Sequence, residues 1–101
     1  MEEPRLRPKY AVQRQDENRA LVGPRMLSTD PDDIDSPFVL MPRKDPAAFE
    51  AMRLYIQLCE PLLATEIRTW LRKIADSATV YGTQGERNRR SIRRMSLIAI
   101  E

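Results

Sequence analysis

The chain of 101 residues is 42% apolar and 32% charged, has a formal net charge of +2, and contains one cysteine and no histidine. This length suffices for one small domain with a modest core. Without histidine, Ser-His-Asp and Cys-His catalysis and all histidine-ligated metal sites are excluded. The lone Cys59 excludes an intrachain disulfide and is typical of a reducing compartment, so we expect a cytoplasmic protein.

The net charge conceals an uneven distribution along the chain. Residues 1–44 carry eight basic and eight acidic groups, and residues 45–79 carry four basic and five acidic ones. Residues 80–101 hold five arginines against Glu86 and Glu101. Any attraction to a polyanion is therefore expected at the C-terminal end of the chain.

The N-terminal part of the chain predicts an arm followed by one weak strand. Residues 1–8 are charged and contain two prolines, which favours a flexible arm. They include no apolar segment of the kind found in signal peptides, and no apolar run in the chain is long enough to span a membrane. Residues 9–14 alternate loosely between polar and apolar side chains, which indicates a strand.

A second strand is expected at residues 37–41, where a continuous apolar run lies between Pro37 and Pro42. The preceding residues 28–36 are acidic and rich in residues that interrupt helices and strands, so they predict a loop. We expect residues 9–14 and 37–41 to pair as a β-hairpin.

Two amphipathic helices are expected over residues 46–58 and 61–76. Aspartate is a preferred N-cap and proline fits the first helical turn, so Asp45-Pro46 marks one helix start and Glu60-Pro61 marks the next. Apolar residues recur at three- and four-residue steps in both helices, which predicts a buried stripe on each. The expected core residues are Ala48, Ala51, Met52, Tyr55, Leu58 and Cys59 in the first helix, and Leu63, Ile67, Trp70, Leu71 and Ile74 in the second.

Together these elements predict an α+β fold, in which a small β-hairpin packs on a two-helix unit and extended charged arms flank both ends. The expected organisation is a flexible arm at residues 1–8, a single domain at residues 9–79, and an arginine-rich arm at residues 80–101 that ends in an apolar segment. If Trp70 is fully buried, Trp70→Ala should cost about 3–5 kcal/mol of stability.

The sequence offers no constellation for catalysis or for cofactor binding. The acidic residues Asp30, Asp32, Asp33 and Asp35 lack the glycine and the distal glutamate of a calcium-binding loop, which favours a solvated acidic loop. The chain has no glycine-rich phosphate loop, and its acids form no paired-carboxylate arrangement. We therefore predict no enzyme activity, no cofactor, no metal and no small-molecule substrate.

Five arginines near the C-terminus form the one cluster that suggests a binding function. If this run is helical, Arg87, Arg90 and Arg94 share one face, and Arg89 and Arg93 lie to one side of it. Such a cluster can contact nucleic-acid phosphates or an acidic protein surface, or it can remain a solvated tail. It contains no aromatic side chain, which argues against a dedicated single-strand binder.

A pattern of capping and core residues runs through about a third of the chain. It is carried by Phe38, Val39, Leu40, Pro42, Asp45, Pro46, Ala47, Ala48, Ala51, Tyr55, Leu63, Ala64, Ile67, Trp70 and Leu71. This pattern resembles small uncharacterised proteins encoded by tailed bacteriophages and related bacterial elements. The resemblance implies a phage setting, in the host cytoplasm or in the virion, and it implies no activity and no functional residue.

From these features we expect a non-catalytic protein–protein interaction protein, encoded by a phage as an accessory or minor structural component. Its arms would contact a protein partner or further copies of the chain. The alternative is a nucleic-acid-binding protein that uses Arg87, Arg89, Arg90, Arg93 and Arg94, and that alternative predicts binding that weakens steeply with salt.

Overall fold

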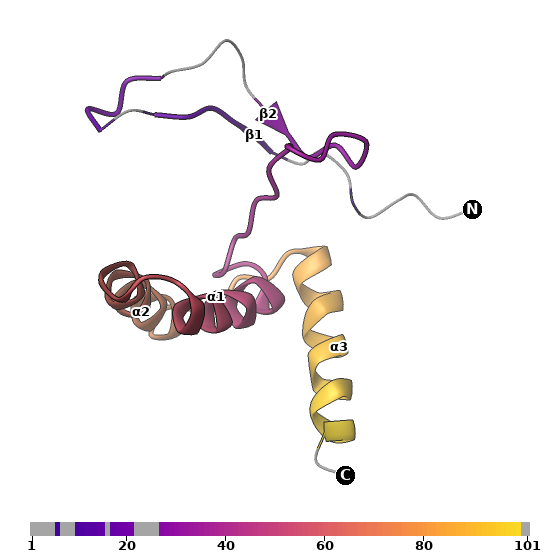
Figure 1. Ribbon diagram of the computed structural model, residues 1–101. Coiled ribbons are helices and arrows are strands. Elements are labelled where there is room, and N and C mark those ends of the chain that lie inside the picture. Colours follow the sequence, from indigo (N-terminus) through magenta and orange to yellow (C-terminus); the bar gives the residue numbers. More distant parts are fainter. Residues whose placement is uncertain (1–5, 7–9, 16, 22–26, 100–101) are drawn as a thin grey trace. The chain divides into compact units, whose positions relative to one another are not determined.

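The computed structural model describes residue 6 and residues 10–15, 17–21 and 27–99, with side chains as far as residue 94. Its elements are β1 (Ala11–Val12), β2 (Leu27–Ser28), α1 (Pro46–Leu58), α2 (Pro61–Ala75) and α3 (Thr83–Ala99), as Figure 1 shows. This content confirms the predicted α+β class. The elements fall into two compact units divided between Val39 and Leu40, and each unit is described by itself.

The N-terminal unit contains a two-stranded antiparallel hairpin. Its strands β1 and β2 pair with Ala11 opposite Ser28 and Val12 opposite Leu27, and a further bridge joins Gln15 to Leu21. The prediction of a strand at residues 9–14 is thus confirmed for Ala11 and Val12 only, since residues 10, 13 and 14 are not strand and residue 9 lies outside the described residues.

The predicted second strand at residues 37–41 is wrong, because these residues form no strand and the partner of β1 is β2. Two prolines, Pro37 and Pro42, remove backbone N–H donors at the ends of this segment, which weakens any ladder it could make. A side chain supplies a hydrogen bond to the segment instead, since the Thr29 hydroxyl donates to the Pro37 carbonyl at 2.6 Å.

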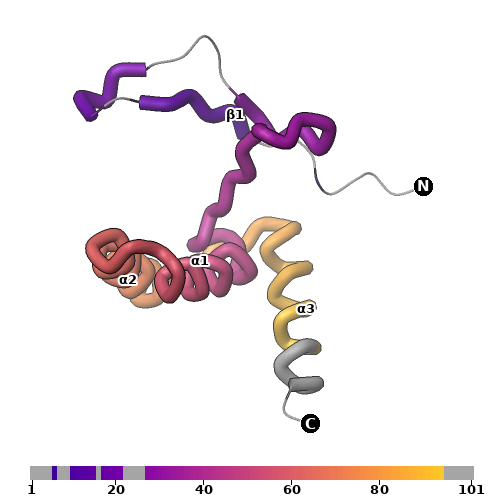
Figure 2. The backbone as a smooth tube through the Cα atoms, in the orientation of Figure 1, coloured from indigo at the N-terminus to yellow at the C-terminus, as the bar shows by residue number. Residues whose placement is uncertain are grey.

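Helices α1 and α2 begin where their capping residues predict. The Asp45 carboxylate accepts a hydrogen bond from the Ala47 N–H at 2.9 Å, and the Glu60 carboxylate accepts one from the Leu63 N–H at 2.7 Å. A proline follows each cap, at a position where its missing N–H costs nothing. The predicted spans are confirmed, with α2 ending one residue earlier than expected, and the two helices lie side by side (Figures 1 and 2).

The core of the C-terminal unit is small. Its buried apolar side chains are Pro42 in the turn before α1, Ala48 of α1, and Ala64, Ile67 and Leu71 of α2. The two alanines allow the helix backbones to approach closely, because a small side chain at a crossing leaves room for the facing helix.

The prediction of Ala51, Tyr55, Leu58, Leu63 and Trp70 as core residues is wrong. Trp70 is 46% exposed and Leu58 is 76% exposed, and Tyr55 and Leu63 are exposed as well. Each of the two short helices buries only a narrow stripe of side chains on the other. The apolar side chains beside that stripe therefore remain exposed. Cys59, expected as a packed thiol, is half-buried.

Helix α3 extends the C-terminal unit into the region where an arm was expected. It spans Thr83–Ala99 and contacts α1, and its first turn carries Glu86, which favours the helix N-terminus electrostatically. The sequence predicts an arginine-rich arm at residues 80–101. Within this range residues 83–99 form a helix, which the prediction of an arm did not specify. Of the arm expected at residues 1–8, the structure describes residue 6 alone. The domain boundaries at residues 8/9 and 79/80 stay predictions.

Candidate functional site

A polar network joins the start of α3 to the start of α1. The Asn88 side-chain amide donates to the Asp45 carboxylate at 2.8 Å, and the Gln84 amide donates to the Asn88 carbonyl oxygen at 3.1 Å. The same oxygen of Asp45 caps α1 through the Ala47 N–H. One carboxylate therefore sets both the beginning of α1 and the position of α3.

A glycine lets the backbone of α3 approach the turn that precedes α1. Gly85 is buried, and a Cβ atom at this position would collide with the Lys44 carbonyl oxygen. Lys44 belongs to a turn closed by its N–H, which donates to the Met41 carbonyl at 3.1 Å. Gly85 thus acts as a contact point between α3 and the rest of the unit, a role that the sequence reasoning missed.

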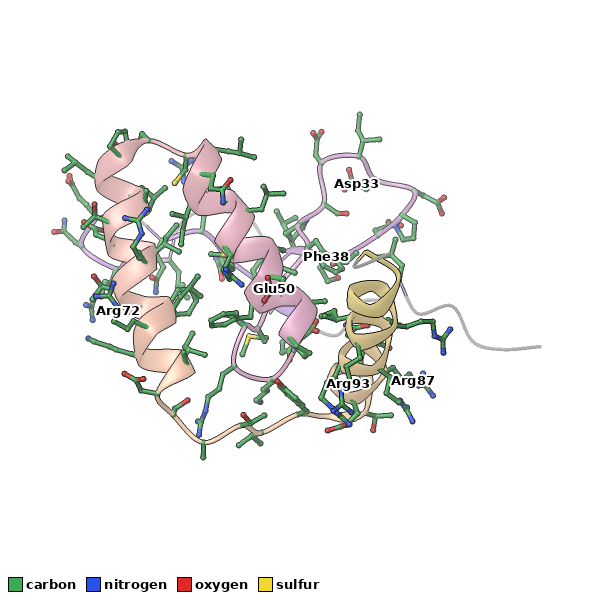
Figure 3. The ribbon with its side chains drawn as sticks, turned by 90° about the horizontal axis from the view of Figure 1, so that it is seen from below. Asp33, Phe38, Glu50, Arg72, Arg87 and Arg93 are labelled. Carbon is green, nitrogen blue, oxygen red and sulfur yellow. The ribbon has the colours of Figure 1, made fainter. Side chains whose placement is uncertain are left out.

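The arginines of α3 divide into one paired residue and four exposed ones. Arg89 donates to the Glu86 carboxylate, with its Nε 3.0 Å from Oε2, and is half-buried. The four exposed residues form no ion pair within the described part of the chain, and Figure 3 labels two of them on α3. They are Arg87, Arg90, Arg93 and Arg94.

The exposed arginines lie on the side of α3 that does not contact α1. The half-buried Asn88 and Ile92 and the buried Gly85 recur at three- and four-residue steps and mark the inner side of the helix. Arg87, Arg90 and Arg94 share the opposite face, as the helical alternative of the sequence analysis predicts. This arginine face, defined as Arg87, Arg90, Arg93 and Arg94, presents concentrated positive charge to solvent.

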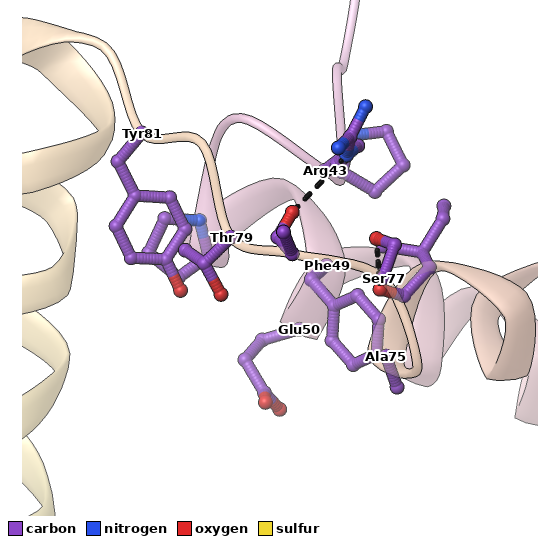
Figure 4. Close-up of a pocket in the computed structure, with 11 residues that line it drawn as sticks. Arg43, Phe49, Glu50, Ala75, Ser77, Thr79 and Tyr81 are labelled. Carbon is purple, nitrogen blue, oxygen red and sulfur yellow. Dashed lines mark hydrogen bonds between the residues drawn. The ribbon is translucent and has the colours of Figure 1, made fainter.

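A shallow pocket of about 240 Å³ lies between the start of α1, the end of α2 and the segment that leads to α3 (Figure 4). This volume is below the roughly 300–1,000 Å³ typical of small-molecule sites. Its walls include the apolar side chains of Phe49 and Ile74. The Arg43 Nε at its rim donates to the Ala78 carbonyl at 3.3 Å, which closes the loop after α2 against the turn before α1.

The polar groups of the pocket are largely engaged. The Glu50 carboxylate accepts hydrogen bonds from Arg53, at 3.1 and 3.2 Å, and the Ser77 hydroxyl donates to the Ile74 carbonyl at 2.6 Å. Tyr81 is half-buried at the far end of the pocket. The described lining brings together no nucleophile with a base.

The exposed apolar side chains of α1 and α2 form a second candidate surface. Three of them lie in the C-terminal half of α1, and three lie in α2, beyond the two-residue turn between the helices. We define this apolar surface as Leu54, Tyr55, Leu58, Leu62, Leu63 and Trp70, all of them exposed. Four of these residues are predicted from the sequence as core residues but are exposed in the structure: Tyr55, Leu58, Leu63 and Trp70.

The acidic loop uses part of its charge to organise its own turns. Asp30 accepts a hydrogen bond from the Asp32 N–H at 2.9 Å, and Asp33 accepts one from the Asp35 N–H at 3.0 Å. All four aspartates are exposed, as a solvated loop requires. Among the residues that the structure describes, no group of three or more acidic, histidine or cysteine side chains is placed to hold a metal ion.

Within the described ranges, no helix has both the length and the apolar character needed to cross a membrane. Comparison of the chain with protein-family models, with curated proteins and with solved structures finds no match.

Proposed function

We propose that the chain is a non-catalytic interaction protein that binds a protein partner through the apolar surface of α1 and α2. The exposure of that surface is the observation that carries the proposal: Leu58 is 76% exposed and Leu62 is 75% exposed. Covering such a side chain is worth roughly 1.5–3 kcal/mol, and contiguous apolar patches are typical of protein-binding sites. The residues of this surface already lie in helices α1 and α2, so a partner need not induce their secondary structure.

A photo-crosslinking experiment tests this proposal. Benzoylphenylalanine is placed at position 62 in the apolar surface and, as a control, at position 34, where Ile34 is 97% exposed in the N-terminal unit. Irradiation in cells of the native host should give one discrete adduct from position 62 and none from position 34. Equal labelling from both positions, or no adduct from position 62, contradicts the proposal.

We further propose that the protein is encoded by a phage, because the pattern of residues 38–71 resembles small proteins of tailed bacteriophages. The chain is then an accessory protein or a minor structural component, found in the host cytoplasm or in the virion. Mass spectrometry of purified virions tests the structural version, which predicts a fixed number of copies per particle after high-salt washing. Complete loss of the chain in that wash contradicts a structural role.

Nucleic-acid binding is a second candidate function, and the arginine face of α3 favours it. Its four guanidinium groups are exposed, and none of them pairs with an acid in the described part of the chain. Guanidinium groups along one helix face can contact successive phosphates of a duplex, with no base readout required.

Fluorescence anisotropy with a random-sequence DNA duplex tests the second candidate. Arg90→Ala/Arg94→Ala should weaken binding about tenfold at low salt and lower the slope of log K against log salt by about 1.8, since each phosphate contact contributes about 0.9. Arg68→Ala/Arg72→Ala removes the same charge from α2 and should leave both quantities nearly unchanged. Equal losses in both variants would show that net charge alone attracts the DNA.

A further inference from the structure

Helix α2 presents a second ordered face in addition to its buried stripe. Five exposed residues of α2 follow one another along the sequence at steps of four, three, one and three residues. This helical spacing places all five on one side of the helix. The buried Ala64, Ile67 and Leu71 lie on another side. We call this side the outer face of α2, and it consists of the exposed residues Leu62, Glu66, Thr69, Trp70 and Lys73.

The outer face can be covered at little cost to its polar groups. The Thr69 hydroxyl already donates to the Thr65 carbonyl of its own helix at 3.1 Å. Burying Thr69 therefore leaves no unsatisfied hydroxyl, which would otherwise cost about 1–3 kcal/mol. Leu62 and Trp70 supply the apolar contact, and the exposed Leu58 and Leu63 extend it at the turn between the helices.

This face carries two opposite charges, Glu66 and Lys73, that form no ion pair with any residue that the structure describes. The positions three and four residues from Glu66 are occupied by leucine, threonine and tryptophan, so α2 itself offers this carboxylate no base. Glu66 and Lys73 are seven residues apart, which places them about 10.5 Å apart along the helix axis.

The charges of α2 and its two caps mostly follow the same order. Glu60 at the N-cap and Glu66 precede Arg68, Arg72 and Lys73, and the C-cap Asp76 is the one acid of this segment that follows them. A helix with this order is complementary to a second copy of itself in the antiparallel direction. In the parallel direction the same two helices would bring like charges together, which is unfavourable.

We propose that the outer face of α2 is a self-association surface whose occupant is a second copy of this chain. The two α2 helices lie antiparallel about a two-fold axis near Thr69 and Trp70, so that Glu66 of each copy meets Lys73 of the other. Such an interface uses one patch twice, as two-fold dimers do. This inference rests on the proposed function, because it identifies the protein partner of the apolar surface as the chain itself.

Sedimentation equilibrium of the full chain tests the proposal directly. The chain should show a reversible monomer–dimer equilibrium, and Leu62→Glu or Trp70→Glu should leave only monomer. Both side chains are exposed, so each variant should keep the helical circular dichroism of the parent. Ile34→Glu places the same charge on an exposed residue of the N-terminal unit and should preserve the dimer. A wild-type chain that stays monomeric at 100 μM overturns the proposal.

A charge swap tests the antiparallel register. Glu66→Lys and Lys73→Glu should each raise the dimer dissociation constant roughly tenfold, because the change acts at two symmetry-related pairs. The double variant Glu66→Lys/Lys73→Glu restores both pairs and should return to within about threefold of wild type. Arg72→Glu is the control for charge reversal away from the outer face and should change the constant little. Failure of the double variant to recover rejects this register.

Zero-length crosslinking of mixed ¹⁴N and ¹⁵N chains identifies which groups meet. Peptides that join Lys73 to Glu66 should contain one light and one heavy partner in the proportion expected for random pairing. Crosslinks from the apolar surface to residues 1–39 of the same chain would show that the N-terminal unit occupies it, and would overturn the proposal. A monomeric chain that still gives a discrete adduct with another protein from position 62 rejects self-association and leaves the proposed function standing.

Discussion

Helices α2 and α3 both contact α1, but different kinds of interaction hold them there. The contact of α2 buries Ile67 and Leu71, whereas α3 is positioned by the hydrogen bonds of Asn88 and by the close approach of Gly85. A buried aliphatic side chain contributes roughly 1.5–3 kcal/mol, and a hydrogen bond contributes about 0.5–1.5 kcal/mol net. Helix α2 is therefore an integral part of the unit, while α3 is held by a few individual contacts.

The largest effect is expected where apolar burial holds α2. Leu71 is 5% exposed, so Leu71→Ala should lower the free energy of unfolding by about 3 kcal/mol. Leu62→Ala makes the same chemical change on the exposed side of α2 and should cost less than about 0.5 kcal/mol. Urea denaturation at a protein concentration too low for self-association measures both values. Similar losses in the two variants would mean that the assignment of the buried stripe is wrong.

Trp70→Ala should fall between these two leucine variants. The side chain of Trp70 is about half covered, so its truncation should cost roughly 1–2 kcal/mol, less than a fully buried tryptophan would. The same denaturation series measures it. A loss as large as that of Leu71→Ala would place Trp70 in the core after all.

An effect of similar size to that of Trp70→Ala is expected at the backbone contact of α3. Serine is a better helix former than glycine, yet Gly85→Ser should destabilise the attachment of α3 by about 2 kcal/mol, because its Cβ collides with the Lys44 carbonyl. Gly82→Ser is the matched control, since a Cβ at Gly82 meets no atom within 4 Å. Circular dichroism at 222 nm during thermal unfolding follows both variants. A stabilised Gly85→Ser variant would show that α3 does not need this close approach.

The smallest effect is expected from the hydrogen bond between α3 and Asp45. Asn88→Ala removes it and should cost about 1 kcal/mol, whereas Asp45→Ala also removes the cap of α1 and should cost about 2 kcal/mol. A double-mutant cycle checks the coupling, because Asn88→Ala should have almost no effect once Asp45 is replaced. Additive losses would indicate that the two side chains do not interact.

The sequence predicted best where local chemistry decides the structure. The Asp45-Pro46 and Glu60-Pro61 pairs placed the starts of α1 and α2 correctly, because capping depends on neighbouring residues alone. The buried face of α2 was predicted less well. Leu63 and Trp70 share the periodicity of Ile67 and Leu71, and periodicity does not reveal how far a neighbouring helix extends across a stripe.

The remaining errors arose where the decisive contact is distant in the sequence. The partner of β1 depends on pairing across a long loop, and two-residue strands leave almost no pattern to detect. Helix α3 was obscured by its arginines, although Asn88, Ile92 and Met95 follow helical spacing and could have indicated it. That Glu66 and Lys73 form no ion pair with any described residue depends on the fold and could not be predicted from the sequence.

The double use of Asp45 has a consequence for the order of events in folding. Its carboxylate accepts one hydrogen bond from Ala47, two residues away, and another from Asn88, forty-three residues away. Short loops close at small entropic cost and long ones at a larger cost, so the capped hairpin of α1 and α2 should form first and α3 should dock last. When the folded chain opens transiently, α3 should detach before α1 and α2 separate. Amide protons of α3 should therefore exchange with solvent through partial opening, while those near Leu71 should exchange only when the whole unit unfolds.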